Sequence, residues 1–405
     1  MKKHGWFLSK GSVIALSIVF IAVMLAGGCS KPTEKKPLPK AKKMTVVKSA
    51  WPGEFDKQQG LWLMWPSDIY NQEWRPTAPV TINIVKAAAQ YIPVKMIVSS
   101  HDEVAKIKNL LRQKGYYGDN VQYFVINHYS IWARDVGPLF VKDANNHLQI
   151  VNFGFNNYSR DGNANYVNTE SQVDKLTGQL LGLPVLNSSI VTEGGGIESN
   201  GRGTMMTTES VALVRNPGMS KQQLETEYKR VLGVSKVIWL KKGLSEDDKI
   251  TTGHINEIAR FASPNTILLA QILPADRYAN KYSQESYLRM EENYKILQKS
   301  TDQDGKPFKI IRIPMPPTLY EEAAQKGMDP PPVRSYLNYA VTNGAVLTQT
   351  YWKPNRSASL KTTEDQVMGI FRKVFPDRKI IGIDAENVNL WGGGIHCITQ
   401  HMPAE

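Results

Sequence analysis

Cysteine is nearly absent from this chain, since 405 residues contain only Cys29 and Cys397. Two cysteines in separate surroundings do not make the repeated spacing of a disulfide framework. The seven histidines are scattered, and neither a His-x-x-x-His nor a Cys-x-x-Cys spacing occurs. Such spacings are typical of zinc ligands. The sequence therefore predicts no disulfide framework and no metal site.

A basic face for nucleic acid is also missing, although the formal net charge is +12. Residues 1–43 hold nine lysines and one acid, so this segment contributes +8 and residues 44–405 carry only +4. An excess confined to a leader and a tail does not make a basic binding face on a folded domain. We therefore expect no nucleic-acid partner.

The first 28 residues have the order of a secretory signal peptide. Lys2 and Lys3 precede an uncharged, apolar stretch, and small residues then lead into Cys29. This junction resembles a bacterial lipoprotein cleavage site, where the cysteine becomes the lipidated first residue. Ser30 then favours the outer membrane of a Gram-negative cell. The alternative is an uncleaved transmembrane anchor, because the apolar stretch is near the lower length limit for a span.

Residues 29–43 are rich in proline and lysine and show no apolar periodicity. Such a composition predicts an extended, self-repelling tether. We therefore expect an exported lipoprotein that is held on the periplasmic side of a membrane through its N-terminal lipid. The folded domain would occupy residues 44–405.

From residue 44 onward, β-branched and aromatic runs alternate with segments of helical spacing. This alternation predicts an α/β domain, and no second linker or short repeat divides it. The predicted strands are 94–100, 121–126, 148–155, 204–214, 235–240, 265–272, 309–315 and 337–347. The predicted helices are 79–91, 101–114, 171–182, 220–232, 283–299 and 363–374.

Four segments differ from an ordinary core because each joins a glycine run or turn to a reactive side chain. Glycine permits close approach of a ligand, and loops present side chains into clefts. Taken singly, each also has a structural reading: an inert buried thiol, a structural histidine, a surface ion pair or a tight turn. The segments are IWARDVGPLF (131–140) with Trp132 and Asp135, TEGGGIESNGRGT (192–204) with Glu193, TTGHINEIARF (251–261) with His254, and NLWGGGIHCITQHMPAE (389–405) with Cys397.

A cysteine and a histidine together can provide a nucleophile and a proton shuttle near neutral pH. That pair alone also fits a cysteine protease. The carboxylates favour a different substrate, because attack on a guanidinium requires anionic partners that hold its fork of N–H groups. Asp135, in an apolar setting with a tryptophan, suits this task.

At these segments the sequence resembles the agmatine deiminase family, which includes the Porphyromonas-type peptidyl-arginine deiminases. The resemblance covers nearly all of residues 50–405. Its motifs, in order, are PGEFDKQQGLWLMWP (52–66), WARDVGP (132–138), EGGGIESNGRGT (193–204), GHINEIARF (253–261), SYLNYAVTNGAV (335–346) and GGGIHCITQHMPA (392–404).

The resemblance implies a five-bladed α/β propeller with pseudo-fivefold symmetry and a central active site. It implies Cys397 as nucleophile, His254 as general acid and base, and Asp135 as a guanidinium-binding carboxylate. It also implies Glu193 as the acid that orients the histidine or contacts the substrate, and Trp132 as an aromatic wall of the pocket. The implied reaction is hydrolysis of a guanidino group to a ureido product and ammonia through a covalent thiouronium, without a cofactor. Agmatine as substrate would place it in putrescine and polyamine biosynthesis.

The resemblance departs from the family pattern at Asn256, where agmatine deiminases generally have Asp as a second carboxylate. An amide accepts one hydrogen bond and brings no charge. Glu257 follows, but the alternation of a strand would point its side chain to the opposite face. A second interpretation therefore stays open: a weakly active or non-catalytic propeller that binds a cationic ligand or a surface partner.

Overall fold

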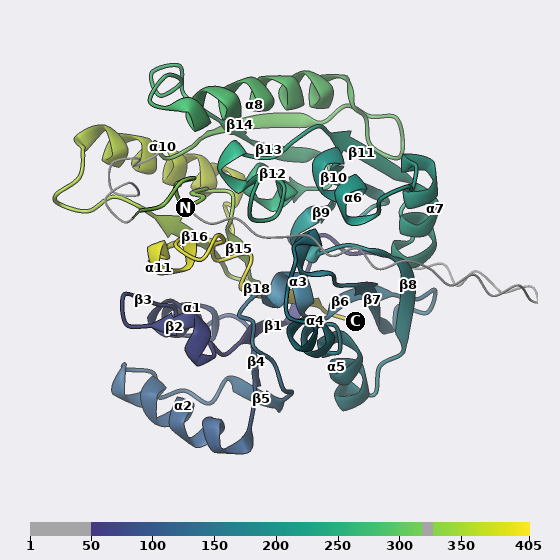
Figure 1. Cartoon of the computed structure of the whole chain (residues 1–405), viewed down its shortest axis with the longest axis vertical. Coiled ribbons are helices and arrows are strands. Elements are labelled where there is room, and N and C mark those ends of the chain that lie inside the picture. Colours follow the sequence, from purple (N-terminus) through teal and green to yellow (C-terminus); the bar gives the residue numbers. More distant parts are fainter. Residues whose placement is uncertain (1–49, 318–326) are drawn as a thin grey trace, which may run out of the picture. The chain divides into compact units, whose positions relative to one another are not determined.

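The computed structural model describes residues 50–317 and 327–405, which form an α/β domain as the sequence predicts. The predicted signal segment, Cys29 and the tether lie outside the described residues. Five sheets of three or four strands and one two-stranded ribbon make up the described part (Figure 1). None of the helices in this part is long and apolar enough to span a membrane.

Four of the sheets follow one plan. A strand pairs antiparallel with a central strand, and a helical connection then leads to a third strand parallel to the central one. A parallel neighbour requires such a crossover, and a hairpin partner does not. The four sheets are β6 (Leu139–Lys142), β7 (Leu148–Gly154) and β8 (Val185–Val191); β9 (Ile197–Ser199), β10 (Thr204–Thr208) and β11 (Lys236–Leu240); β12 (Ala259–Ser263), β13 (Thr266–Gln271) and β14 (Lys309–Pro314); and β15 (Ala340–Val341), β16 (Ala345–Thr350) and β17 (Lys379–Asp384).

The fifth sheet repeats this plan with strands from both ends of the domain. Its central strand β1 (Gln58–Met64) pairs antiparallel with β18 (Thr399–Pro403), and Figure 1 shows these two strands side by side. On its other side β1 is parallel to β4 (Val94–Val98), which is parallel to β5 (Val121–Val125). The segment that carries Cys397 runs directly into β18, so pairing with β1 fixes its position.

The crossover helices bear out most of the predicted helical segments. In the fifth sheet, α1 (Ala78–Ala88) leads from β1 to β4, and α2 (His101–Gln113) leads from β4 to β5. The helices of the other sheets are α4 (Ala164–Glu170) and α5 (Val173–Leu181) after β7, α6 (Glu209–Arg215) and α7 (Lys221–Leu232) after β10, α8 (Lys281–Lys299) after β13, and α10 (Ala358–Val374) after β16. The remaining short elements are β2 (Asn71–Gln72), β3 (Arg75–Pro76), α3 (Ala133–Val136) and α11 (Glu386–Asn389).

Helix α7 shows why local sequence predicted these elements well. Ser220 and Gln223 form a reciprocal capping box at its start, and Gly233 ends it with φ +68°. Both are strong boundary signals. Leu224, Tyr228 and Val231 lie on its buried face at helical spacing.

The predicted strand 204–214 is wrong beyond residue 208, because α6 begins at Glu209. The run that follows is short, apolar and β-branched, and periodicity alone does not distinguish such a run from a strand. The helix buries Val211 and Ala212 and delivers Arg215 to the interior of the domain.

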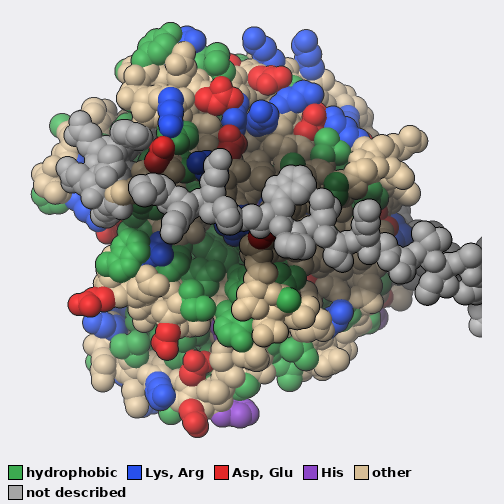
Figure 2. Space-filling model, in the orientation of Figure 1, with side chains coloured by type: hydrophobic (Ala, Val, Ile, Leu, Met, Phe, Trp, Pro, Cys, Tyr) green, Lys and Arg blue, Asp and Glu red, His purple; other side chains and the backbone are tan. Residues whose placement is uncertain are grey.

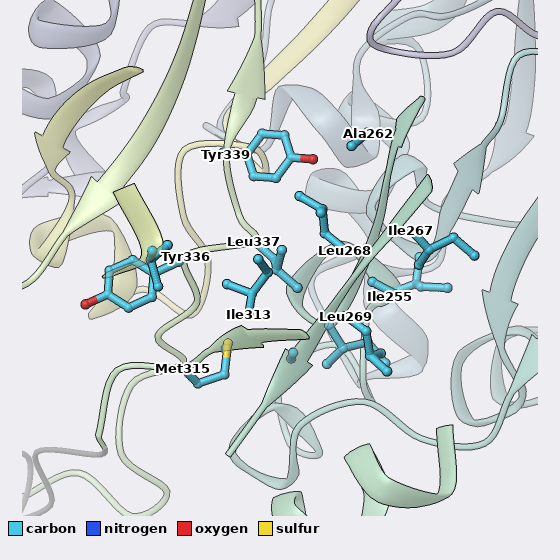
Figure 3. Close-up of a cluster of buried hydrophobic side chains, with 14 of the residues drawn as sticks. Ile255, Ala262, Ile267, Leu268, Leu269, Ile313, Met315, Tyr336, Leu337 and Tyr339 are labelled. Atoms are coloured by element: carbon cyan, nitrogen blue, oxygen red, sulfur yellow. The ribbon is translucent and has the colours of Figure 1, made fainter. Parts of the chain in front are cut away.

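A buried cluster beside β13 and β14 fixes the turn that carries His254. Ile255, the next residue, lies among Ile267 and Leu269 in Figure 3, and all three are fully buried. Burying an aliphatic side chain contributes about 1.5–3 kcal/mol. The histidine is therefore held by core packing as well as by its own hydrogen bonds.

The surface over α8 carries charges of both signs. Figure 2 shows lysine and arginine side chains interspersed with aspartate and glutamate there. Arg289 pairs with Glu285 and Asp248, and Arg312 pairs with Glu291. Several of the basic side chains on this surface are therefore paired with acids.

Candidate active site

Cys397 is the only free cysteine of the described residues, and it is 5% exposed. Its Sγ lies 3.0 Å from Asn338 Nδ2, 3.5 Å from Asn256 Nδ2 and 3.7 Å from Glu257 Oε1. Burial, and then the carboxylates of Glu257 and Asp135, raise the pKa of the Cys397 thiol well above its ordinary value. The surroundings of Cys397 thus favour the neutral thiol, and two amide N–H groups are directed at the sulfur.

The triple glycine 194–196 allows three site residues to meet around one backbone turn. A Cβ on Gly195 would lie 2.6 Å from His254 Nδ1, 2.8 Å from Asp135 Oδ1 and 3.0 Å from Asn256 Nδ2. The Gly195 N–H also donates to Asp135 Oδ1 at 3.0 Å. The absence of a side chain at this position thus permits the assembly of the site.

His254 is fixed at its backbone and at one ring nitrogen. Its N–H donates to Asp247 Oδ2 at 2.9 Å, and its Nε2 lies 3.2 Å from Glu193 Oε2. Burial disfavours the imidazolium, but Asp135 and Glu193 outweigh this effect and raise the pKa of His254. The buried Nδ1, 3.9 Å from Asp135 Oδ1, has no hydrogen-bond partner. A charged imidazolium with one unoccupied donor suits a general acid.

Glu193 is held in its ionised form by a buried ion pair. Arg215 Nε donates to Glu193 Oε1 at 2.7 Å, and both side chains are fully buried. Burial raises the pKa of this carboxyl, but the hydrogen bond from His254 and the charge of Arg215 lower it overall. Glu193 therefore orients the imidazole while Arg215 balances its charge.

Asp135 lies on α3 within hydrogen-bonding reach of several site groups. Its Oδ2 accepts from the Tyr158 hydroxyl at 3.0 Å, and Tyr158 also packs its ring 5.9 Å from that of His254. Burial raises the pKa of Asp135 against the opposing effect of His254. The backbone of α3 is bonded to the nucleophile segment, since Arg134 N–H donates to Cys397 O at 3.0 Å.

Trp132 forms an aromatic wall beside the nucleophile. Its ring edge would meet a Cβ on Gly393 at 2.5 Å, and the same Cβ would lie 3.1 Å from Cys397 Cβ. Tyr70 packs edge-on against Trp132, with ring centroids 5.9 Å apart, and also contacts Trp391. Only one glycine thus separates the indole from the cysteine.

A buried network supports the segment before Cys397. His396 Nε2 lies 2.8 Å from Glu54 Oε2, and Asn256 Nδ2 lies 2.9 Å from His396 Nδ1. Burial, with Arg134 and Arg260 nearby, lowers the pKa of His396 well below its ordinary value. The neutral ring donates to Glu54 and accepts from Asn256, which orients the Asn256 amide.

Glu54, Glu198 and His396 offer oxygen and nitrogen atoms within 4.8 Å of one another, a spacing that could hold a metal ion. However, Arg260 forms ion pairs with both carboxylates. Their charge is therefore already balanced by a guanidinium, and the cluster acts as structural support.

The structure brings together all the site residues that the sequence indicates in the described domain: Trp132, Asp135, Glu193, His254, Asn256 and Cys397. Asn256 presents a buried Oδ1 without a hydrogen-bond partner. The expectation for Glu257 was wrong, because Ile255–Glu257 forms a 3-10 turn instead of a strand. The side chains of residues 256 and 257 therefore both reach the sulfur.

Several further residues of the site escaped sequence reasoning, namely Arg215, Asp247, Asn338 and the Tyr158 that donates to Asp135. Arg215 directly follows the run 204–214 that the sequence presented as a strand, and Asp247 lies in a short acidic stretch. Asn338 lies in the SYLNYAVTNGAV motif (335–346), between Leu337 and Tyr339. A polar residue at this place in a predicted strand was a signal that could have indicated a role in the site.

Gly195→Ala tests the assembly of the site around the glycine turn. We expect turnover to fall by about a hundredfold or more, because the added methyl group would displace His254, Asp135 or Asn256, and misplacement of about 1 Å has effects of this order. Gly369→Ala on α10 is the matched control, since nothing lies within 4 Å of its Cβ position. Equal turnover in the two variants, measured by ammonia release, would contradict this geometry.

The chain is similar to known proteins along nearly all of its folded domain. A model of the Porphyromonas-type peptidyl-arginine deiminase family matches residues 50–403, and the chain belongs to that family. An agmatine deiminase of Medicago truncatula is 32% identical over 382 residues, which cover 87% of this chain and 96% of that protein. An agmatine deiminase of Pseudomonas fluorescens is 29% identical over 372 residues, covering 87% and 95%. The solved agmatine deiminase of Enterococcus faecalis is 25% identical, has a TM-score of 0.73, and matches over 88% of this chain and 96% of its own.

Proposed function

We propose that the protein hydrolyses the guanidino group of agmatine or a related arginine-like compound, giving a ureido product and ammonia. One observation carries the proposal: the sulfur of Cys397 lies among buried carboxylates, next to the unpartnered His254 Nδ1 and Asn256 Oδ1. Unpartnered buried polar atoms are unfavourable unless a ligand satisfies them. The family relatives that carry the name agmatine deiminase support the same reaction.

The charge of the site favours a cationic substrate. Four acids with buried side chains surround the nucleophile and His254, namely Asp135, Glu193, Asp247 and Glu257. Arg215 is the only arginine paired with any of them among the described residues. A planar guanidinium brings the missing positive charge, and its N–H groups can bind carboxylate oxygens in pairs.

The first half of the reaction breaks a carbon–nitrogen bond. The bound guanidinium places positive charge beside the Cys397 thiol, which lowers the thiol pKa, and the proton leaves to water. The thiolate attacks the guanidino carbon. His254 donates a proton to one terminal nitrogen, ammonia departs, and a thiouronium remains on the sulfur. Asn338 and Asn256 direct their N–H groups at the sulfur and stabilise the thiolate.

The second half restores the enzyme. His254, now neutral, removes a proton from a water molecule, and the resulting hydroxide attacks the same carbon. The carbon–sulfur bond breaks, the leaving thiolate takes up the hydroxyl proton of the product, and the ureido product is released. Glu193, fixed by Arg215, keeps the imidazole in position through both halves. Division of one difficult hydrolysis into two steps is the general advantage of covalent catalysis.

The non-catalytic interpretation has weaker support. It rests on the amide at residue 256, yet Glu257 supplies a carboxylate at the same sulfur. A protein that only binds a cation does not require a cysteine with two directed amides or a histidine whose Nδ1 is left unpaired.

Covalent trapping tests the proposed function directly. Chloroacetamidine carries the planar cation of the substrate, whereas iodoacetamide is neutral. We expect chloroacetamidine to label Cys397 faster than iodoacetamide, and agmatine to protect against labelling; peptide mapping separates Cys397 from Cys29. Preferential labelling by the neutral reagent, without protection by any guanidino compound, would contradict the proposal.

We propose that the five sheets are the blades of a pseudo-fivefold α/β propeller. Their shared order of an antiparallel strand, a central strand and a parallel strand supports this arrangement. So does the closing of one sheet by the first and last strands of the domain. The site residues come from segments between the sheets, as a central site requires.

We also propose that the domain, from about residue 44, is exported and attached to a membrane through a lipid on Cys29. The order of basic, apolar and small residues before this cysteine supports the proposal. In a Gram-negative cell, Ser30 after the cysteine favours the outer membrane as the location.

The mature N-terminus can be measured. We expect the intact mass of the membrane-extracted protein to correspond to a chain that begins at a lipidated Cys29. Cys29→Ser should accumulate the precursor, while ammonia release per folded molecule stays unchanged because the substitution is outside the domain. A mass that retains residues 1–28, with normal processing of Cys29→Ser, would instead indicate an uncleaved anchor.

A further inference from the structure

Glu257 lies in direct contact with the nucleophile. Its side chain is 4% exposed, and Oε1 lies 3.7 Å from Cys397 Sγ. The contact depends on the 3-10 turn Ile255–Glu257, which brings adjacent residues to one site. The Ser335 hydroxyl donates to Glu257 O at 2.7 Å and fixes this turn from the loop before β15.

Asn338 connects the carboxylate with the sulfur. Its Nδ2 donates to Glu257 Oε1 and also lies 3.0 Å from Cys397 Sγ. Its Oδ1 accepts from the His396 N–H at 2.6 Å, so the amide cannot reverse without losing these contacts. The acid and the thiol are therefore held side by side.

No lysine or arginine of the described chain forms an ion pair with Glu257, whereas Glu193 is paired with Arg215. The titratable groups that face Glu257 are Asp247 at the end of the η4 turn (Ser245–Asp247), His254, Cys397 and Tyr351. Only His254 among them can be positive, and Glu193 and Asp135 lie against its ring. A buried carboxylate without a cation of its own is unfavourable.

We propose that Glu257 is a further catalytic residue, which is neutral in the empty site and becomes the carboxylate that binds the guanidinium beside the nucleophile. Binding of the substrate cation then releases the Glu257 proton to water. The inference rests on the proposed function and names a binding group within the same site. Burial, followed by the charge of Asp247, raises the pKa of Glu257 to about 8, in line with a protonated resting state at neutral pH.

The proposal predicts a selective loss in Glu257→Gln, which keeps the shape of the side chain and removes its charge. We expect kcat/KM for the guanidino substrate to fall about tenfold to hundredfold, the range for one charge-assisted hydrogen bond. The rate of Cys397 labelling by chloroacetamidine should fall by a similar factor. Labelling by neutral iodoacetamide should stay about equal, because Glu257 is neutral in the substrate-free enzyme and glutamine therefore leaves the charge beside the thiol unchanged. A general loss of structure would instead expose the buried thiol to both reagents, which a lower unfolding midpoint of the same preparation would reveal.

Glu227→Gln is the matched control, because this carboxylate is also buried but binds Arg230, Ser188 and Ser189. It should leave the ratio of the two labelling rates unchanged. Unaltered kcat/KM and an unaltered ratio in Glu257→Gln would overturn the proposal. If the wild type itself shows no preference for the cationic reagent, the proposed function fails instead.

Proton release gives a test that does not depend on the stability of the Glu257 variant. In Cys397→Ser, agmatine binding is measured by calorimetry in buffers of different ionisation enthalpy. Below pH 8 we expect binding to release close to one proton, and the release should vanish as the pH rises above 8, where free Glu257 is already ionised. Absence of release from Cys397→Ser at every pH would contradict a neutral resting Glu257.

Discussion

Cys397→Ala is expected to abolish turnover while leaving the fold intact. Removal of a covalent nucleophile reduces kcat by about 10⁴-fold or more, because the remaining binding groups supply only a small part of the catalysis. The substitution removes one buried sulfur and creates no unpaired charge, so the unfolding midpoint should change little. Ammonia release and thermal unfolding of the same preparation measure both effects.

The matched control is Cys29→Ser, which changes the only other cysteine of the chain. Each variant loses one cysteine, but only Cys397→Ala should lose activity. Ammonia release by Cys397→Ala at the wild-type rate would exclude a thiouronium intermediate on this sulfur.

Arg215→Met is expected to have the largest effect on stability. The substitution leaves the ionised Glu193 carboxylate buried without its partner, and breaking a buried pair in this way costs about 3–5 kcal/mol. It also removes the Arg215 Nη2 hydrogen bond to Thr251 O, in the segment that leads to His254. We therefore expect a lower denaturant midpoint together with a large loss of turnover.

A double variant separates the effect of charge from that of packing at this pair, and a variant at an exposed ion pair is the control. Glu193→Gln combined with Arg215→Met removes both charges and should recover stability relative to Arg215→Met alone, but it should not recover activity. Arg202→Met breaks an exposed pair with Asp56 and should cost at most about 1 kcal/mol. Equal midpoints for Arg202→Met and Arg215→Met would contradict the importance of the buried pair.

Much of the fold could be predicted from the sequence because most segments carry local signals. The capping box of Ser220 and Gln223 and the glycine after α7 mark a helix without reference to the rest of the molecule. The run 204–214 lacked such a signal, since its apolar residues fit a strand and a helix equally. There, packing on the remainder of the domain decides the structure.

The site could be predicted in part because glycine runs and turns adjoin its reactive residues. The position of Glu257 could not, because strand alternation does not apply to a 3-10 turn. Asn338 and Arg215 reach the site through contacts with residues 59 and 22 positions away, Cys397 and Glu193. Only the folded chain shows such contacts.

The products of the reaction test the central claim most directly. Purified wild-type protein is incubated with agmatine and, separately, with arginine, and ammonia, ureido product, urea and free diamine are quantified together. Hydrolysis through Cys397 and His254 predicts ammonia and the ureido product in equal amounts from at least one of the two compounds, with no urea. Urea and a free amine as the products, or no product from either compound, would contradict it.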